Sequence, residues 1–259
     1  MTKIAFIGTG NMGGALILGL LRTKLYDVYV YDLDSNKAKQ FEAKGATLCS
    51  SIEYAAENAD FLILTVKPNV YPSVLQTLAK LNYSKKLITV APGITTSFVK
   101  SILPNASVVR TMPNTPALVG EGITLVADGE DKALVSSVCD ILNCVGKTAV
   151  LAEDLLEAGT ALSGSSPAIV YKLIEVMAES ALSYGIGKKQ AVEIAAQTVL
   201  GSAKMILETK KHPCELIDNV CSPGGTTIAA MNELAVQGFD KAVLKSMERC
   251  VDKTKSMRK

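Results

Sequence analysis

Hydrophobic positions follow two different patterns along the chain, and the change comes near residue 152. In the first part, short apolar runs bounded by polar residues are typical of strands covered on both faces of a parallel sheet. The expected strands are residues 4–7, 28–31, 61–66, 87–90, 108–109, 122–127 and 148–151. Helical apolar spacing lies between several of them, at 15–21, 35–41 and 132–143. This alternation predicts an α/β domain over residues 1–152.

From residue 153 to 259 the sequence contains long helical patterns and no convincing strand, which predicts an all-α second domain. We expect helices at 153–162, 168–184, 188–207 and 228–251, with breaks at the glycine and proline clusters 164–167, 185–187 and 223–225. Residues 168–207 are apolar on more than one face, which is typical of buried helices. We expect a second copy of the chain to cover them, in a homodimer formed through the C-terminal helices. This pattern does not distinguish a homodimer from a larger homo-oligomer.

Three glycines follow the first expected strand at G-x-G-x-x-G spacing: Gly8, Gly10 and Gly13. Gly8 permits a tight turn, Gly10 has no side chain to hold off a pyrophosphate, and Gly13 lets the following helix lie close to the strand. The unpaired N–H groups of that helix then face the phosphates. The pattern favours dinucleotide binding; the alternative is a glycine-rich turn that packs a strand on a helix without a ligand.

Asp32 ends the second expected strand, where an acidic side chain can accept hydrogen bonds from the adenosine ribose and repel a 2′-phosphate. The alternative for Asp32 is a charge at the N-terminus of the helix 35–41. Ser35 and Lys37, which follow, could instead hold a phosphate. NADH is therefore expected to be usable, and NADPH is not excluded.

Three further strands end in loops rich in proline, glycine or asparagine. These loops begin at Lys67-Pro68, at Ala91-Pro92-Gly93 and at Met112-Pro113-Asn114. In an open parallel sheet, ligands bind beyond the carboxyl ends of the strands. We therefore expect the three loops to line the nicotinamide side of a cofactor cleft.

The helical part contains a second glycine-led helix start, Ser222-Pro223-Gly224-Gly225-Thr226-Thr227. Its N–H groups and hydroxyls suit a small anion such as a carboxylate. The alternative is a simple helix cap supplied by Thr226. The stretch 162–168, Leu-Ser-Gly-Ser-Ser-Pro-Ala, is similarly constrained.

Composition excludes several classes of protein. Apolar residues make up 48% of the chain, so a core can form, and the net charge of +2 without a basic stripe predicts no nucleic-acid partner. The apolar run 15–21 is too short to span a bilayer, and no signal peptide is apparent, so we expect no membrane association. The six cysteines form no C-x-x-C pair and there is one histidine, which predicts no metal site and reduced thiols in the cytoplasm.

Together the motifs resemble the pyrroline-5-carboxylate reductase family over the whole chain. The matching stretches are residues 6–13, 66–68, 112–117, 162–168, 201–205 and 221–228. The resemblance implies an N-terminal Rossmann-type domain and an all-α C-terminal dimerisation domain. It also implies hydride transfer from NADPH or NADH to the C=N carbon of a cyclic imino acid, 1-pyrroline-5-carboxylate. The product is L-proline, in the last step of proline biosynthesis.

The resemblance also implies site residues. Ser222, Gly224, Gly225, Thr226 and Thr227 would bind the substrate carboxylate, and Thr227 would donate a proton near the ring nitrogen. The implied cofactor residues are Gly8, Gly10, Asn11, Met12, Gly13, Asp32, Ser35, Val66, Lys67, Pro68, Ala91, Met112 and Asn114. The chain departs from the family pattern at Asp32, Pro92 and Ile169, where the family often has Ser or Thr, Ala and Tyr.

An imine substrate fits a site without a strong acid. A protonated imine loses its charge when hydride adds, whereas a carbonyl develops an alkoxide that needs a nearby acid. Two alternatives stay open. A β-hydroxyacid dehydrogenase would use a lysine of the helical domain, for which Lys172 is the candidate, and a non-catalytic NAD(P)-binding protein would need no second helix start. His212, before Pro213, is expected to be a solvated turn residue.

Overall fold

The computed structural model describes residues 1–256, which fall into two compact units. The first unit contains residues 1–165 and 250–256, and the second contains Ser166–Arg249. The division therefore lies after Ser165, later than the boundary at residue 152 expected from the sequence. Leu156 explains the difference, because it packs with strand residues Met112 and Leu125 in the core of the first unit.

In the described residues the first unit contains one sheet of eight strands in the order β3-β2-β1-β4-β5-β6-β7-β8. Strands β1 to β6 are parallel, β7 runs antiparallel to β6, and β8 is parallel to β7. The strands are β1 Thr2–Ile7, β2 Tyr26–Tyr31, β3 Thr47–Leu48, β4 Phe61–Leu64, β5 Lys86–Thr89, β6 Ser107–Met112, β7 Gly122–Ala127 and β8 Gly146–Leu151. The predicted α/β class is confirmed. The two-residue β3 is too short to leave a pattern in the sequence.

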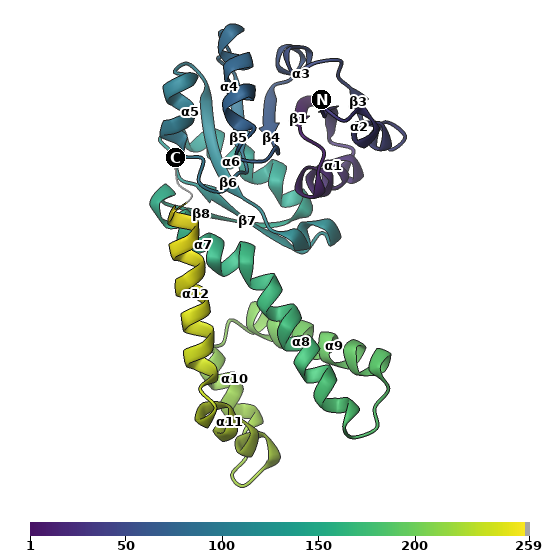
Figure 1. The fold of residues 1–259 in the computed structure, drawn as a ribbon, viewed down its shortest axis with the longest axis vertical. Helices are drawn as coiled ribbons and strands as arrows, with labels where there is room; N and C mark the ends of the chain where they lie inside the picture. The colour runs from purple at the N-terminus through teal and green to yellow at the C-terminus, as the bar shows by residue number, and fades with distance from the viewer. Residues whose placement is uncertain (257–259) are drawn as a thin grey trace. The chain divides into compact units, whose positions relative to one another are not determined.

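Helices cover both faces of this sheet (Figure 1). Alternate residues of β1 face opposite sides of the sheet. Ile4 and Phe6 pack in one hydrophobic cluster, and Ala5 and Ile7 pack in the other. The first cluster includes residues of α1 and α6, and the second includes residues of α3, α4 and α5. The helices of this part are α1 Asn11–Thr23, α2 Ser35–Glu42, α3 Ile52–Asn58, α4 Tyr71–Lys80, α5 Thr96–Ile102, α6 Lys132–Leu142 and α7 Leu156–Thr160. Short 3₁₀ turns lie at Thr115–Val119, Asn143–Val145 and Glu153–Leu155.

The expected break at residues 164–167 is wrong. After α7 the chain makes a π-helical turn, Ala161–Ser165, and continues directly into α8, Ser166–Leu182. Pro167 does not stop the helix, because the Ser163 carbonyl, which the N–H of residue 167 would meet in an α-helix, accepts a hydrogen bond from the Asn114 side chain instead. Glycine and proline in this stretch therefore accompany a widened helical turn and not a loop.

The helices after α8 are α9 Lys188–Thr209, α10 Pro213–Val220, α11 Thr226–Val236 and α12 Phe239–Ser256. One expected helix, 228–251, is thus two, because Gly238 adopts a φ of +77° between α11 and α12. The short helix α10 was not expected. His212 begins it as an exposed N-cap whose Nδ1 accepts a hydrogen bond from the Cys214 N–H.

The second unit exposes much of its apolar surface. Its buried hydrophobic side chains in the described residues are three alanines, Ala178, Ala191 and Ala195. Large apolar side chains are exposed on every helix of this unit, among them Tyr171, Ile194, Leu200, Leu207, Val220, Val236 and Leu244. A surface of this kind calls for a partner. None of the helices in residues 1–256 is long and apolar enough to cross a membrane.

Candidate dinucleotide and substrate sites

The glycine loop between β1 and α1 has the geometry that phosphate binding requires. Gly8 adopts a φ of +100°, and a Cβ on Gly13 would lie 2.4 Å from the Gly8 carbonyl oxygen. A Cβ on Gly10 would meet nothing within 4 Å, so the space in front of this residue is open. Gly10 is the N-cap of α1, and within the described chain no side chain caps this helix. The N–H groups near Asn11, Met12 and Gly13 are therefore left for a ligand.

A cavity of about 420 Å³ lies beside this loop, at the carboxyl ends of β1, β2 and β4. Five of the predicted cofactor residues line it, namely Gly8, Gly10, Asp32, Val66 and Lys67. Residues of α4 close another side, among them Ser73 and Val74. The predicted residues thus come together at the edge of the sheet where ligands of this fold class bind.

Thr65 and Thr9 hold the glycine loop, and neither was predicted from the sequence. The Thr65 hydroxyl donates to the Gly8 carbonyl, and a Cβ on Gly13 would lie 2.7 Å from that hydroxyl oxygen. The Thr9 N–H donates to the Asp32 carboxylate. Thr9 lies within the motif and Thr65 directly follows β4, so only the folded chain shows that both hold the loop.

Asp32 faces the loop and does not cap α2. Its carboxylate accepts hydrogen bonds from Thr9 and from the Asp34 N–H, whereas the cap of α2 is Asp34, which accepts from the Asn36 N–H. The charge at the N-terminus of α2, which was the alternative role for Asp32, is therefore supplied by Asp34. Ser35 is the first residue of α2 and is not among the residues that line the cavity.

The residues expected on the nicotinamide side lie at the ends of neighbouring strands. Ala91 follows β5 and Met112 ends β6, and both are buried. The Asn114 side chain is also buried, and its amide has two protein partners: it donates to the Ser163 carbonyl at 3.0 Å and accepts from the Ile123 N–H at 2.9 Å. Pro68 follows Lys67 outside the cavity lining.

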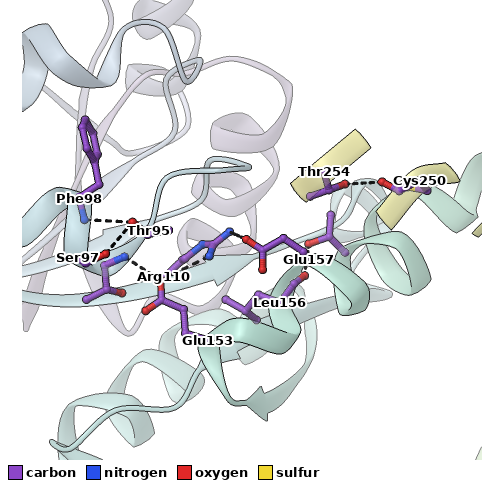
Figure 2. A network of polar contacts seen from close by, with 11 residues as sticks. Thr95, Ser97, Phe98, Arg110, Glu153, Leu156, Glu157, Cys250 and Thr254 are labelled. Atoms are coloured by element: carbon purple, nitrogen blue, oxygen red, sulfur yellow. Dashed lines mark hydrogen bonds and ion pairs between the residues drawn. The ribbon is translucent and has the colours of Figure 1, made fainter. Parts of the chain in front are cut away.

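Sequence reasoning missed a buried ion pair between Arg110 of β6 and Glu157, with the partly exposed Glu153 beside it. Figure 2 shows the Arg110 guanidinium facing the carboxylates of Glu153 and Glu157. Arg110 and Glu157 lie 3.0 Å apart with side chains 1% and 2% exposed, and Glu153 also accepts from the Thr96 N–H at the start of α5. Because Arg110 is on β6, these contacts tie the strand that ends at Met112 to α5 and α7. In the sequence, the signal for this ion pair is an arginine within a strand whose other residues are mostly apolar.

In the second unit, residues 222–225 form a tight turn before α11. The Gly225 N–H donates to the Ser222 carbonyl at 3.0 Å, Pro223 is the second residue of the turn, and Gly224 has a φ of +70°, as in a type II turn. A Cβ on Gly225 would lie 2.5 Å from the Ser222 hydroxyl oxygen. The glycine therefore lets this hydroxyl lie against the backbone.

Gly225, and not Thr226, is the N-cap of α11, and no side chain of residues 1–256 caps this helix. Its first turn contains no acidic residue. The N–H groups of Thr226 and Thr227 therefore have no partner within the helix. Together with the Ser222 and threonine hydroxyls, they form a set of donors suited to a carboxylate.

Lys172, the candidate of the dehydrogenase alternative, and two cysteines hold their protons tightly. Lys172 is exposed on α8 and paired with Glu175, and this hydrogen bond raises the pKa of Lys172, so its ammonium holds the proton more tightly. Burial raises the pKa of the Cys144 thiol to about 12 and that of Cys49 to about 11. Among the described residues, no group of three or more His, Cys, Asp or Glu side chains could hold a metal ion.

A dinucleotide-binding α/β unit followed by an all-helical unit with its own glycine-led helix start defines a nicotinamide-dependent oxidoreductase of two domains. Comparison with known families agrees with this class. A model described as NADP oxidoreductase, coenzyme F420-dependent, matches residues 3–93, and one described as pyrroline-5-carboxylate reductase dimerisation matches residues 153–257.

Relatives extend the match to the whole chain. The pyrroline-5-carboxylate reductase of Escherichia coli is 38% identical and covers 99% of this chain and 98% of its own. A solved pyrroline-5-carboxylate reductase from Coxiella burnetii has a TM-score of 0.92 at 33% identity, covering 100% of this chain and 99% of that one. The Plasmodium falciparum structure, with NADP bound, has a TM-score of 0.88 at 28% identity and covers 100% and 98%. The chain belongs to the pyrroline-5-carboxylate reductase family.

Proposed function

We propose that this protein catalyses the NAD(P)H-dependent reduction of 1-pyrroline-5-carboxylate to L-proline, the last step of proline biosynthesis. The observation that carries the proposal is the uncapped start of α11 behind the Ser222–Gly225 turn. A protein that only binds a dinucleotide needs the first glycine loop and has no use for a second set of converging donors. A substrate with a small carboxylate requires such donors.

The substrate carboxylate is held by the N–H groups at the start of α11 and by the hydroxyls of Ser222 and Thr226. This grip fixes the ring so that its C=N carbon can receive a hydride, which the nicotinamide supplies when bound. Thr227 lies one residue further along α11 and donates a proton to the ring nitrogen of a neutral imine, recovering it from water. Hydride and proton together convert the imine into the secondary amine of proline.

The cofactor is NADH or NADPH, and the first unit binds it. Open space at Gly10, the close approach at Gly13 and the uncapped start of α1 support this assignment. The residues lining the cavity would surround the adenosine and diphosphate, and the ends of β5 and β6 would carry the nicotinamide side. Asn11, Met12, Ser35, Pro68, Ala91, Met112 and Asn114 remain predicted cofactor residues.

The working form is a homodimer built through the C-terminal helices. Support comes from the second unit, whose exposed apolar side chains lie on α8, α9, α10, α11 and α12 while its own buried apolar residues are alanines. We place the enzyme in the cytoplasm, where reduced thiols are the rule. The six cysteines, all within the described residues, are free.

The test is reduction of 1-pyrroline-5-carboxylate by the purified protein, followed by loss of nicotinamide absorbance, with proline identified by amino-acid analysis. We expect turnover with stoichiometric proline. A β-hydroxyacid offered with the oxidised cofactor serves as the control substrate and should give no turnover. Turnover of the hydroxyacid without reduction of the imine would contradict the proposal.

A further inference from the structure

The hydroxyl of Tyr71 joins the carboxyl ends of two neighbouring strands. It donates to the carbonyl of Leu64, the last residue of β4, at 2.7 Å, and it accepts from the N–H of Val90, directly after β5, at 3.2 Å. Tyr71 is fully buried and is the first residue of α4. One side-chain atom therefore connects β4, β5 and α4 at the edge of the sheet where the cofactor cavity lies.

The two backbone groups that this hydroxyl bonds are natural partners in the ladder between β4 and β5. The Thr65 N–H donates to the Ile7 carbonyl of β1, so Leu64, the residue before it, turns its own carbonyl toward β5. Leu64 lies opposite Thr89 in the register, and in a parallel pair the N–H one residue further, that of Val90, meets this carbonyl. The hydroxyl thus bonds both groups at the last position of the ladder, where the two loops leave the sheet.

Both of these loops carry residues of the cofactor site. Val66 and Lys67 follow β4 and line the cavity, whereas the loop after β5 carries Ala91, a predicted residue of the nicotinamide side. The Val70 N–H donates to the Lys67 carbonyl at 2.9 Å and closes the turn that leads into α4. The loop 65–70 is therefore tied at both ends, and the hydroxyl at its end also fixes the start of the loop that carries Ala91.

We propose that Tyr71 is a positioning residue of the cofactor site, whose hydroxyl fixes the loops after β4 and β5 at the spacing that receives the nicotinamide end of the cofactor. A buried hydroxyl with two backbone partners holds both loops before the cofactor binds. Preorganisation of this kind lowers the cost of binding. The inference rests on the proposed nicotinamide-dependent function and adds to it a residue that acts through the loops without touching the cofactor.

Tyr83 offers a matched control on the same strand. It is also buried, and its hydroxyl donates to the Lys86 carbonyl at 2.9 Å. Lys86 begins β5, so this contact lies at the opposite end of the strand from Val90. Removing the Tyr83 hydroxyl therefore costs a buried hydrogen bond in the same sheet and leaves the loops at the cavity as they are.

The test measures two dissociation constants by isothermal titration calorimetry, without an imine: that of NADH and that of ADP-ribose, which lacks the nicotinamide ring. Tyr71→Phe removes only the hydroxyl, so we expect the dissociation constant of NADH to rise by about tenfold. That of ADP-ribose should change by less than about twofold, because Thr65 still holds the glycine loop through its hydrogen bonds to Ile7 and Gly8.

Tyr83→Phe should change neither dissociation constant. Tyr71→Met, whose flexible apolar side chain can fill the space of the ring, should have the same effect as Tyr71→Phe and takes its place if that variant does not fold.

The proposal is overturned if Tyr71→Phe and Tyr71→Met, shown by circular dichroism to be folded, bind NADH as tightly as the wild-type protein. It is also overturned if they lose affinity for NADH and ADP-ribose equally, or if Tyr83→Phe weakens NADH binding as much, because a general loss of order then explains the effect. Since the measurement contains no imine, the two proposals fail separately. A protein that binds NADH but does not reduce 1-pyrroline-5-carboxylate refutes the proposed function alone, and reduction with an unchanged NADH constant in Tyr71→Phe refutes the positioning role alone.

Discussion

The side-chain amide of Asn114 donates to the carbonyl of Ser163 at 3.0 Å, four residues before Pro167. In an α-helix the N–H of residue 167 would donate to that carbonyl, and proline has none. A residue of the loop after β6 thus supplies the hydrogen bond that the helix cannot. The contact joins two stretches, 112–117 and 162–168, that lie far apart in the sequence and share an expected role in the site.

The Asn114 contact gives the first prediction. Asn114→Leu should lower the free energy of unfolding by about 2 kcal/mol or more, because the Ile123 N–H and the Ser163 carbonyl lose a partner inside the protein. In a Pro167→Ala background the restored N–H can reach the carbonyl, so the same substitution should cost about 1 kcal/mol less. Urea unfolding of the four proteins measures this cycle. An identical cost in both backgrounds would show that Pro167 and Asn114 do not share the carbonyl.

The ion pair beneath β6 gives the second prediction. Arg110→Met leaves the Glu157 charge buried without a partner and should lower the free energy of unfolding by about 3 to 5 kcal/mol. Replacing both residues, in Arg110→Met/Glu157→Leu, should recover most of that loss, since a buried pair contributes little beyond its apolar equivalent. Chemical unfolding followed by circular dichroism measures both. If the double variant loses as much as the two single variants added together, the pair is not coupled.

The turn before α11 gives a third prediction, with a matched control in the same unit. A Cβ on Gly225 would lie 2.5 Å from the Ser222 hydroxyl oxygen, whereas one on Gly187, the N-cap of α9, meets nothing within 4 Å. Gly225→Ala should therefore raise KM for 1-pyrroline-5-carboxylate by about tenfold or more and leave the dissociation constant for NADH unchanged. Gly187→Ala should change neither. Equal effects of the two substitutions would remove the turn from the substrate site.

Thr227 gives the fourth prediction. Thr227→Val keeps the shape of the side chain but removes the hydroxyl, and it should lower kcat by about 100-fold while cofactor binding stays the same. Thr227→Ser retains the donor and should keep most of the wild-type rate. Steady-state kinetics with the imine and fluorescence titration with NADH separate the two effects. An unchanged kcat in Thr227→Val would mean that the hydroxyl donates no proton in the rate-limiting step.

Much of the sheet could be predicted because its strands leave a strong local pattern. The run 61–66 is a nearly continuous apolar stretch, and Gly8, Gly10 and Gly13 have the spacing typical of a turn between a strand and a helix. The same local reasoning failed at Pro167 and at Gly238. Whether a helix continues or ends there depends on partners elsewhere, such as the Asn114 amide, and on a backbone φ that glycine permits but does not require.

The candidate site was predictable in part for the same reason. Motif spacing located Asp32 and residues 222–227, but it could not show that Thr9 fixes the Asp32 carboxylate. Nor could it show that the Asn114 side chain has two protein partners. Asn114 was expected as a cofactor residue, and these hydrogen bonds favour a contribution through the position of its loop. Long-range partners of this kind leave no periodic signal.

A co-crystal structure with NADH and L-proline, the product of the proposed reaction, tests the central claim most directly. We predict that the proline carboxylate accepts hydrogen bonds from the N–H groups and hydroxyls of residues 222–227, with its ring nitrogen near the Thr227 hydroxyl. The diphosphate of NADH should lie against the N–H groups of residues 10–13. A proline carboxylate bound anywhere else, with the cofactor in place, would contradict the account.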